Sequence, residues 1–265
     1  MGEVRPAVTR APLLAGMPMK IGVMGSATGE LAAAQLATAR ELGRAIASRG
    51  CLLITGGCPG LPLEAARGAK AAGGFVLGIS PGLSLDEHVG KYDSPTEAHD
   101  VLIYTGSGLM GREVVNIRSS DIVVLIGGRS GTLGELAIAY DEGKLIGVVT
   151  GTGGVSDMAR EILSTCKKDT GARVVYNADP QALLEQLMEV YTAEHFRRPS
   201  CFCTGRGPGV SQASQPGWLQ DPVCGMWIDP VAAPAWRDVR GWHHLFCSTN
   251  CADRFGRDPG KFGRT

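Results

Sequence analysis

Residues 121–126 read DIVVLI, a continuous apolar run in which β-branched residues predominate. A run of this kind predicts a strand that is buried on both faces, as in a parallel sheet covered by helices. Similar runs predict further strands at residues 20–26, 51–55, 75–79, 100–104, 145–150 and 173–176. Segments with apolar residues at helical spacing alternate with these strands, at residues 30–49, 63–72, 110–119, 132–143, 155–166 and 180–191. The predicted fold class is therefore α/β, with a doubly wound parallel sheet of the Rossmann-like type.

Changes in composition divide the chain into successive parts. Residues 1–19 carry few structural signals and are expected to form a flexible leader, whereas residues 20–195 contain the alternating strands and helices. Residues 196–218 are rich in Gly, Pro, Ser and Gln and lack periodicity, so we expect a linker. Residues 219–265 then form a small cysteine-rich domain. A segment of that size buries little apolar surface, and a bound metal would help it to fold.

The balance of charges excludes several classes of partner. The chain carries 26 Lys and Arg residues and 26 Asp and Glu residues, so its formal net charge is zero. We expect no nucleic-acid or membrane partner, because no basic excess is present and no apolar run approaches the roughly 20 residues that span a bilayer. The N-terminal residues also lack the apolar core of a secretory signal. We therefore expect a cytoplasmic protein whose eight cysteines are reduced thiols or metal ligands.

Two glycine-rich loops each follow a predicted strand and precede a predicted helix: residues 55–60 read TGGCPG, and residues 127–132 read GGRSGT. Glycine permits positive φ and a close approach of the backbone to a ligand, and a helix N-terminus offers N–H groups to an anion. Carboxyl ends of parallel strands meet at one edge of a sheet, so we expect these loops to bind a small phosphorylated ligand rather than only to form tight turns. The predicted contacts are Gly25, Ser26, Gly56, Gly57, Gly127, Gly128, Arg129, Ser130, Gly131 and Thr132.

Residues 127–135, GGRSGTLGE, together with Arg112, Arg118 and Asp121, resemble the signature of the LOG-like superfamily. This superfamily includes cytokinin-activating phosphoribohydrolases and molybdenum-cofactor carrier proteins, and the resemblance covers about residues 20–191. It implies a homodimer and, in the hydrolase branch, catalytic roles for Arg112 and Glu135. A carboxylate there would position water and stabilise the positive charge that develops on the ribose as the N-glycosidic bond breaks. The planar guanidinium of the arginine would orient the substrate.

Departures from the LOG-like signature favour the carrier branch. Gly127 replaces the family's proline, Arg129 replaces a glycine, and Glu113 replaces the lysine that often follows the arginine. We therefore expect a binding or carrier protein for a phosphate-bearing nucleotide-like or pterin-type molecule, the molybdenum cofactor included. The alternative is a nucleoside 5′-monophosphate phosphoribohydrolase. A third interpretation makes Arg112 and Glu135 only a helix salt bridge or a solvated pair.

Other polar residues of this region receive lesser roles. His88 and His99 lie in a predicted loop and are expected to be solvated, without a function. Asp121 is expected to be structural. Cys58 lies inside a glycine-rich loop and could contact the ligand.

The C-terminal cysteines follow the spacing C-x22-C-x3-C, with Cys224, Cys247 and Cys251 as the candidate metal ligands. Residues four apart face the same side of a helical turn, and a hairpin between Cys224 and Cys247 would bring in the third thiolate. Three sulfur ligands suit Zn(II) or Cu(I). The alternative is that the reduced cysteines only pack a miniature core.

The segments DPVCGM (residues 221–226) and FCSTNC (residues 246–251) resemble the YHS domain, a relative of the TRASH metal-binding modules, across about residues 219–262. The resemblance implies metal binding. A fourth ligand could come from His243 or His244, or from Cys201 and Cys203 in the linker. One further functional hypothesis follows, in which the cysteine domain is a metal-responsive regulator of the first domain.

Overall fold

The computed structural model describes residues 18–194 and 219–262, apart from residues 229, 231, 232 and 240. Residues 1–17 of the predicted leader and the whole predicted linker lie outside the described residues, as do Cys201 and Cys203. Within the described part of the chain, no helix has both the length and the apolarity needed to cross a membrane.

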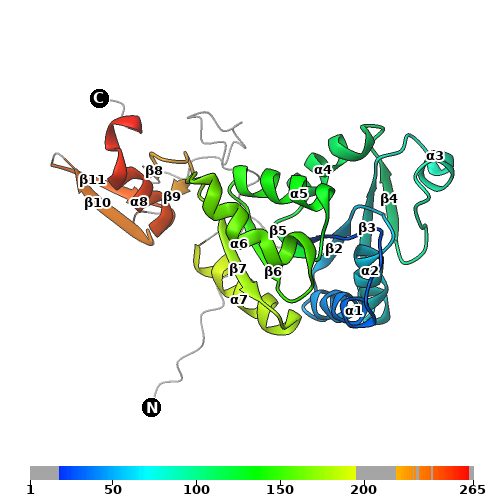
Figure 1. Cartoon of the computed structure of the whole chain (residues 1–265). Coiled ribbons are helices and arrows are strands. Elements are labelled where there is room, and N and C mark those ends of the chain that lie inside the picture. Colours follow the sequence, from blue (N-terminus) through cyan, green and yellow to red (C-terminus); the bar gives the residue numbers. More distant parts are fainter. Residues whose placement is uncertain (1–17, 195–218, 229, 231–232, 240, 263–265) are drawn as a thin grey trace, which may run out of the picture.

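Seven strands of the described chain form one parallel sheet in the order β4-β3-β2-β1-β5-β6-β7 (Figure 1). The strands are β1 (Lys20–Gly25), β2 (Leu52–Thr55), β3 (Val76–Ser80), β4 (Val101–Tyr104), β5 (Ile122–Ile126), β6 (Leu145–Val149) and β7 (Arg173–Asn177). The chain moves outward from β1 to β4, returns to the other side of β1 at β5, and moves outward again to β7. The direction of winding therefore reverses between β1 and β5, which confirms the predicted doubly wound fold.

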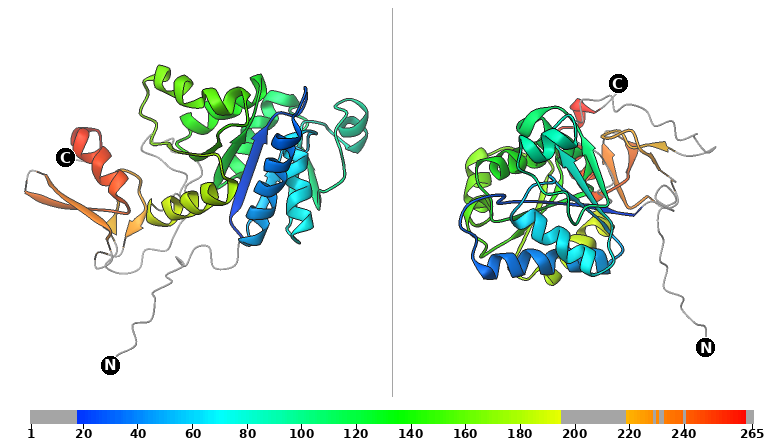
Figure 2. Two further views of the ribbon diagram at one scale, coloured as in Figure 1. Left: turned by 60° about the horizontal axis from the view of Figure 1, so that its bottom comes forward. Right: turned by 90° about the vertical axis from the view of Figure 1, so that its right-hand side faces the viewer.

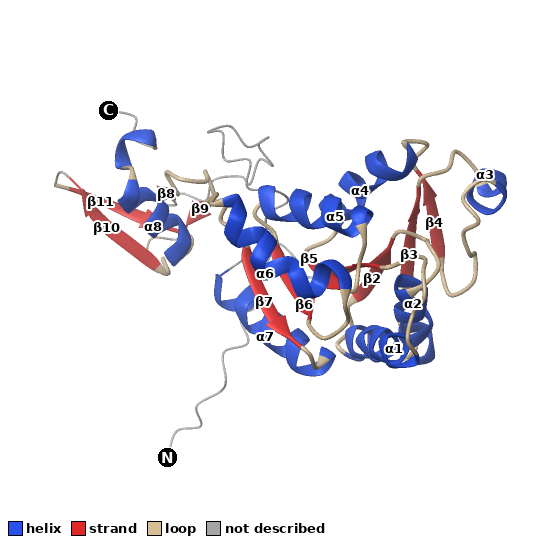
Figure 3. Ribbon diagram, viewed as in Figure 1, coloured by secondary structure: helices blue, strands red, loops and turns tan. Residues whose placement is uncertain are grey.

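Helices cover both faces of the sheet, as Figure 3 shows. They are α1 (Ala33–Ser48), α2 (Leu61–Ala71), α3 (Leu85–Gly90), α4 (Gly108–Ser119), α5 (Ser130–Asp141), α6 (Gly154–Cys166) and α7 (Pro180–Glu194). Helices α1, α2 and α7 pack on one face with Ile122 and Val124 of β5, while α4, α5 and α6 pack on the other face with Val123 and Leu125. Figure 2 shows α1 and α2 side by side on their face. Every residue of β5 is buried, as its continuous apolar run predicts.

The predicted strands are all present, and the main error is α3, which lies in a segment predicted to be a loop. Its six residues are too short for a periodic pattern, and the main sequence sign is Ser84, whose hydroxyl accepts a hydrogen bond from the Glu87 N–H at the helix start. Helix α1 begins at Ala33 instead of residue 30, because Ala32 is extended, with φ −66° and ψ 147°.

The expectation that His88 and His99 are solvated is wrong. His88 is fully buried, with Nδ1 2.8 Å from Ser80 Oγ and Nε2 3.0 Å from the Pro95 carbonyl oxygen. His99 Nε2 lies 3.0 Å from the Thr55 hydroxyl. Both imidazoles bridge loops at the carboxyl ends of β2 and β3, and they have a structural role there.

The C-terminal segment has its own small hydrophobic cluster, which includes Phe246, Cys247, Cys251 and Phe255. Its elements are the antiparallel pairs β8 (Leu219–Gln220) with β9 (Trp227–Ile228) and β10 (Ala235–Val239) with β11 (Trp242–Phe246), then α8 (Thr249–Arg257) and a 3-10 turn at Pro259–Lys261. The predicted hairpin between the first two cysteines of the C-terminal pattern is therefore present, as the pair β10–β11.

Candidate functional site

A cavity of about 780 Å³ opens at the carboxyl ends of β1, β2 and β5, where the winding of the sheet reverses. Ligands bind at this place in open parallel sheets, and small-molecule sites have volumes of about 300–1,000 Å³. The cavity is lined by both predicted catalytic residues and by most predicted phosphate contacts: Arg112, Glu135, Gly25, Ser26, Gly56, Arg129, Ser130, Gly131 and Thr132. The structure therefore brings together residues from loops that are far apart in the sequence.

The predicted contacts Gly57, Gly127 and Gly128 do not line the cavity. The N–H of Gly127 donates to Thr152 Oγ1 at 2.8 Å, and the N–H of Gly128 donates to Ser26 Oγ at 2.8 Å. Both glycines have positive φ, 62° and 109°, which only glycine adopts easily. Their hydrogen bonds are internal, and they tie the loop after β5 to the loop after β1, so that α5 begins at the cavity.

The first turn of α5 forms the rim of the cavity. Arg129, the residue before the helix, makes no side-chain capping hydrogen bond, and Ser130 and Gly131 are exposed. The Arg129 side chain is exposed as well, with Nη1 3.4 Å from Thr28 Oγ1. The helix N-terminus and the guanidinium together give this rim a positive potential that suits an anion.

Arg112, from α4, lies deeper in the cavity and is only 7% exposed. Its guanidinium covers Gly56, where an added Cβ would lie 1.6 Å from Nη1. Among the described residues, Arg112 Nε has no hydrogen-bond partner. Gly56 therefore leaves room for an arginine of the protein, whose charge lies in the cavity near the carboxyl groups of Glu113 and Glu135.

Glu135 lies one turn into α5 and is also 7% exposed. Burial raises the pKa of Glu135 to about 7, although Arg112 opposes the shift and Glu113 adds to it. Asn116, on α4, also acts on this carboxyl group and favours a lower pKa of Glu135. The interpretation of Arg112 and Glu135 as a solvated surface pair is therefore wrong: both are buried groups that face the same cavity. Asn116 was not identified from the sequence, although it lies one helical turn after Arg112.

Two further groups line the cavity between these residues. Cys58 faces Arg112, and burial raises the pKa of its thiol, so the group is protonated at neutral pH. Glu113 is 7% exposed, and burial raises the pKa of its carboxyl group. The sequence singled out Glu113 only as a departure from a family pattern, and its place inside the cavity could not be foreseen.

Cys224, Cys247 and Cys251 form a compact cluster in the C-terminal segment. The Sγ atoms of Cys224 and Cys247 are 3.5 Å apart, and those of Cys247 and Cys251 are 3.8 Å apart. Asp221 belongs to the same cluster, because its carboxylate and the three sulfur atoms all lie within 4.8 Å of one another. Hydrogen bonds from the Cys224 and Cys247 thiols lower the pKa of Cys251.

Asp221 also fixes the backbone around the cluster. Its Oδ1 accepts hydrogen bonds from the N–H groups of Val223 at 2.8 Å and Cys224 at 3.2 Å, and its Oδ2 accepts one from the Cys247 N–H at 2.8 Å. The N-terminus of α8 contributes Cys251, whose N–H donates to Ser248 Oγ. Backbone hydrogen bonds to Asp221 and Ser248 thus hold the three cysteines in place, in addition to the hydrogen bonds between the thiols.

The candidate fourth ligands His243 and His244 are not in this cluster. His243 Nδ1 hydrogen-bonds to Asp238, and its ring stacks on Trp236 at 4.9 Å between centroids. The ring of His244 packs against Phe255. Asp221 takes the place predicted for a histidine, and Cys201 and Cys203 lie outside the described residues.

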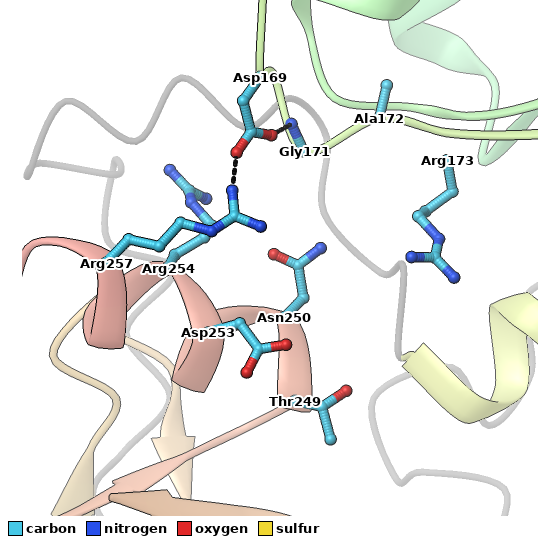
Figure 4. A pocket seen from close by; sticks show the side chains of 9 residues that line it. All are labelled: Asp169, Gly171, Ala172, Arg173, Thr249, Asn250, Asp253, Arg254 and Arg257. Carbon is cyan, nitrogen blue, oxygen red and sulfur yellow. Dashed lines mark hydrogen bonds and ion pairs between the residues drawn. The ribbon is translucent and has the colours of Figure 1, made fainter.

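A second hollow, of about 270 Å³, lies where α8 meets residues 169–173 (Figure 4). Arg257 of α8 forms an ion pair with Asp169, whose carboxylate also accepts a hydrogen bond from the Gly171 N–H at 3.2 Å. Charged residues of both signs line the hollow, and the Arg257–Asp169 pair is exposed. The contact joins the helix that carries Cys251 to the loop before β7.

Comparison with known proteins identifies the family of the first domain. The model of a family described as the SLOG cluster4 family matches residues 18–184. An uncharacterized protein of Archaeoglobus fulgidus is 38% identical over 128 residues, which are 48% of this chain and 78% of the relative. A cytokinin riboside 5′-monophosphate phosphoribohydrolase of Mycobacterium tuberculosis is 35% identical over 111 residues, which are 42% of this chain and 56% of that enzyme.

Among solved structures, the molybdenum cofactor carrier protein of Chlamydomonas reinhardtii is similar, with a TM-score of 0.53 and 34% identity. The alignment covers 64% of this chain and 99% of the carrier protein. The family match ends at residue 184, before the cysteine cluster.

Proposed function

Because the chain belongs to the SLOG cluster4 family, we propose that it is a binding or carrier protein for a phosphate-bearing nucleotide-like or pterin-type molecule. The observation that carries this proposal is the buried guanidinium of Arg112, which faces the cavity and whose Nε has no partner among the described residues. An anionic ligand in the cavity would pair with the guanidinium. The similarity to a molybdenum cofactor carrier supports the same class of ligand.

The cavity offers two places for negative charge. Arg112 provides an interior cation, and the α5 N-terminus with Arg129 provides a positive rim. Either place suits a phosphate, and the remainder of the ligand would lie in the same cavity beside Glu135. A nucleotide and the molybdenum cofactor are both candidates, because each joins a phosphate to a planar heterocycle.

Isothermal titration of the full chain with nucleoside 5′-monophosphates tests the binding proposal. Arg112→Gln is expected to raise the Kd at least about tenfold, since a hydrogen-bonded charge pair is lost. Arg44→Gln is the matched control, because Arg44 lies on the surface of α1 and pairs only with Glu41. Equal affinities of wild type and Arg112→Gln for every ligand that binds would refute the role given to Arg112.

The second candidate function is phosphoribohydrolase activity, and Glu135 is the observation that favours it. A carboxyl group with a pKa of about 7 is suited to proton transfer at neutral pH. Its carboxylate would take a proton from water, and the water would attack the ribose carbon as the base departs. The hydrolase relative supports this reading.

Incubation with AMP and related monophosphates, with assay of free base, separates the two functions. Base release that disappears in Glu135→Gln would establish hydrolysis and displace the carrier proposal. Binding without release would support the carrier.

We further propose that Cys224, Cys247 and Cys251 hold a metal ion, Zn(II) or Cu(I). A tetrahedral zinc site with Zn–S bonds of about 2.3 Å requires sulfur atoms about 3.8 Å apart, and the observed separations are 3.5 and 3.8 Å. Asp221 offers an oxygen as the fourth donor, which favours zinc over Cu(I). No disulfide joins the cysteines of the described residues, which suits a reducing compartment such as the cytoplasm.

Elemental analysis of the purified full chain tests the metal site. About one metal ion per chain is expected in the wild type, and little in Cys247→Ser. A Cys166→Ser variant is the control, because Cys166 is exposed and lies on α6. A wild-type protein that folds without bound metal would contradict the metal site and would indicate that the cysteines only pack the small core.

Metal control of the first domain is the remaining functional proposal, and the Arg257–Asp169 ion pair supports it. The pair links α8, which begins at the cysteine cluster, to the parallel sheet. Removal of metal with a chelator would then change the Kd for a nucleotide in the wild type but not in Arg257→Gln. An unchanged Kd in the wild type would exclude the coupling.

We also propose that two copies of the chain form a homodimer, in which the exposed apolar side chains around β4 of one copy contact those of the other. β4 is an edge strand of the sheet, and exposed apolar side chains lie on it and on the neighbouring α3 and α4 (Figure 1). They include Leu85, Val89, Val101, Ile103, Leu109 and Met110. Leu109 also lines the cavity, so a partner on this surface would approach the ligand.

A further inference from the structure

Glu113 has an unusual place in the cavity. It follows Arg112 on α4, and its carboxylate lies over the first turns of α5. Its Oε1 is 3.3 Å from the position that a Cβ would take at Gly131, and its Oε2 is 2.8 Å from the corresponding position at Gly134. Two glycines on one face of α5 therefore leave the space that the carboxylate fills.

The Glu113 carboxylate has no hydrogen bond or ion pair with any residue that the structure describes, although the side chain is only 7% exposed. It lines the cavity together with Arg112 and Glu135. Its oxygens are not among the fully enclosed, unpartnered side-chain atoms of the described residues, so they face the open cavity. A ligand that covers them must bring a donor, because burying an unpaired carboxylate is costly. A donor that enters the cavity with a ligand would satisfy it.

The shape of the carboxylate limits which donors fit. Two oxygens side by side accept two parallel N–H bonds, as in bidentate pairs. A guanine-type edge, with a ring N–H beside an exocyclic amino group, presents such a pair. An adenine edge presents one amino group beside a ring nitrogen that is itself an acceptor, so one carboxylate oxygen would face a lone pair.

Resting on the proposed function, we infer that Glu113 determines ligand specificity: its carboxylate accepts the paired N–H donors of a guanine-type edge, as found in guanine nucleotides and pterins. Arg112, whose guanidinium covers Gly56, binds the phosphate of the same ligand. The two charges thus recognise different parts of one molecule, because Arg112 lies at Gly56 and Glu113 lies at α5, although the two residues are consecutive on α4.

A purely structural role for Glu113 makes a different prediction. A carboxylate near the N-terminus of α5 interacts favourably with the helix dipole, by about 0.3–1 kcal/mol. That interaction would stabilise the protein whatever ligand is present. Selectivity between ligands therefore separates the two roles, whereas a change in stability alone does not.

The experiment is isothermal titration of the full chain with GMP, IMP, AMP and dihydroneopterin monophosphate. Wild type is expected to bind GMP at least about tenfold more tightly than AMP, as a bidentate pair discriminates by about that factor or more. IMP lacks the exocyclic amino group and is expected to lie between them. Comparing the Kd of GMP with that of the pterin shows whether the cavity prefers a guanine nucleotide or a pterin, since the ligand with the lower Kd is the better match.

Glu113→Gln is expected to reduce the preference for GMP over AMP to within about threefold, because the amide offers only one acceptor oxygen and opposes a ring N–H with its own donor. Glu161→Gln is the matched control, since Glu161 is exposed on α6, and it should keep the preference. Thermal denaturation verifies that both variants fold. If Glu113→Gln does not fold, Glu113→Asp replaces it, and the shorter carboxylate is expected to weaken GMP more than AMP.

The outcomes distinguish the inference from the function on which it rests. Equal wild-type affinities for GMP and AMP, or a preference that survives in Glu113→Gln, would overturn the role of Glu113 and leave a nucleotide-binding cavity. Absence of binding by all four ligands would overturn both proposals.

Discussion

Replacing Glu135 with glutamine is predicted to stabilise the protein at alkaline pH and to leave its stability unchanged at acid pH. Burial raises the pKa of Glu135 to about 7 from the ordinary value of 4.5. Glutamine has nearly the shape of the protonated side chain and cannot ionise. The variant therefore reproduces the wild type with this one proton permanently bound.

The magnitude follows from linkage between protonation and folding. Each pKa unit corresponds to about 1.4 kcal/mol, so a rise from 4.5 to about 7 amounts to about 3 kcal/mol. The folded state holds its proton more tightly than the unfolded chain, so the wild type loses stability as the pH rises through this range. Below about pH 4.5 both states are protonated and the difference from Glu135→Gln vanishes. Above about pH 7 the variant is more stable by the full amount.

Urea unfolding at pH 5, 7 and 9 measures this difference. Far-UV circular dichroism is the appropriate probe, because the tryptophans, at positions 218, 227, 236 and 242, all follow the strands of the parallel sheet in the sequence. Glu161→Gln, on an exposed face, serves as the control. A difference between wild type and Glu135→Gln that does not change with pH would refute the argument that burial keeps this carboxyl group protonated.

Further predictions concern packing, metal binding and assembly. Gly56→Ala should destabilise the protein by about 1–3 kcal/mol, since its Cβ would lie 1.6 Å from Nη1 of Arg112; urea unfolding should show no comparable loss for Gly256→Ala, which has open space around it. Asp221→Ala should reduce the bound metal per chain in elemental analysis, because the N–H groups of the metal-binding loops lose their acceptor; full retention would contradict the role of Asp221. Met110→Glu should convert a dimer to a monomer in light scattering, since Met110 is 77% exposed, and a monomeric wild type would exclude the dimer.

The sheet could be predicted because each strand carries its own signal. The five residues Ile122–Ile126 are all apolar and all buried, so no distant partner is needed to recognise them. Helix α3 could not be predicted in this way. It has a single capping residue, Ser84, and six residues give too few positions for a period of 3.6 to be visible.

The glycine-rich loops show the limit of this reasoning. A glycine signals either positive φ or a close neighbour, but the sequence does not identify the neighbour. At Gly128 the N–H donates to Ser26, which is 102 positions away, and at Gly56 the space is taken by Arg112. Both loops do lie at the cavity, as predicted. Some of their glycines, however, contact side chains of the protein itself instead of facing the space for a ligand.

The cysteine pattern was informative for a similar reason. Its spacing predicted that Cys224, Cys247 and Cys251 meet, and they do. The prediction of His243 or His244 as the fourth ligand was wrong. Their contacts, with Asp238 on β10 and Phe255 on α8, could not be foreseen from the sequence. Asp221 could have been found, since an aspartate two residues before a turn N–H often accepts its hydrogen bond.

The charges in the cavity link ligand binding to the choice between carrier and hydrolase. The buried groups Arg112, Glu113 and Glu135 already place two carboxyl groups beside one guanidinium. A phosphate monoester adds between one and two negative charges near neutral pH, and like charges raise the pKa of a carboxyl group. Because the pKa of Glu135 is about 7 before a ligand binds, binding should complete its protonation.

A protonated Glu135 cannot accept a proton from water, so ligand binding near neutral pH opposes hydrolysis and favours retention of an intact ligand. Titrations of GMP at pH 7.5 in two buffers of different ionisation enthalpy should therefore reveal proton uptake. Glu135→Gln should bind GMP with a smaller uptake, since Glu135 no longer takes up a proton and Glu113 is the remaining buried carboxyl group of the cavity. Uptake of equal size in both proteins would show that another group is protonated, and the electrostatic argument for a carrier would then fail.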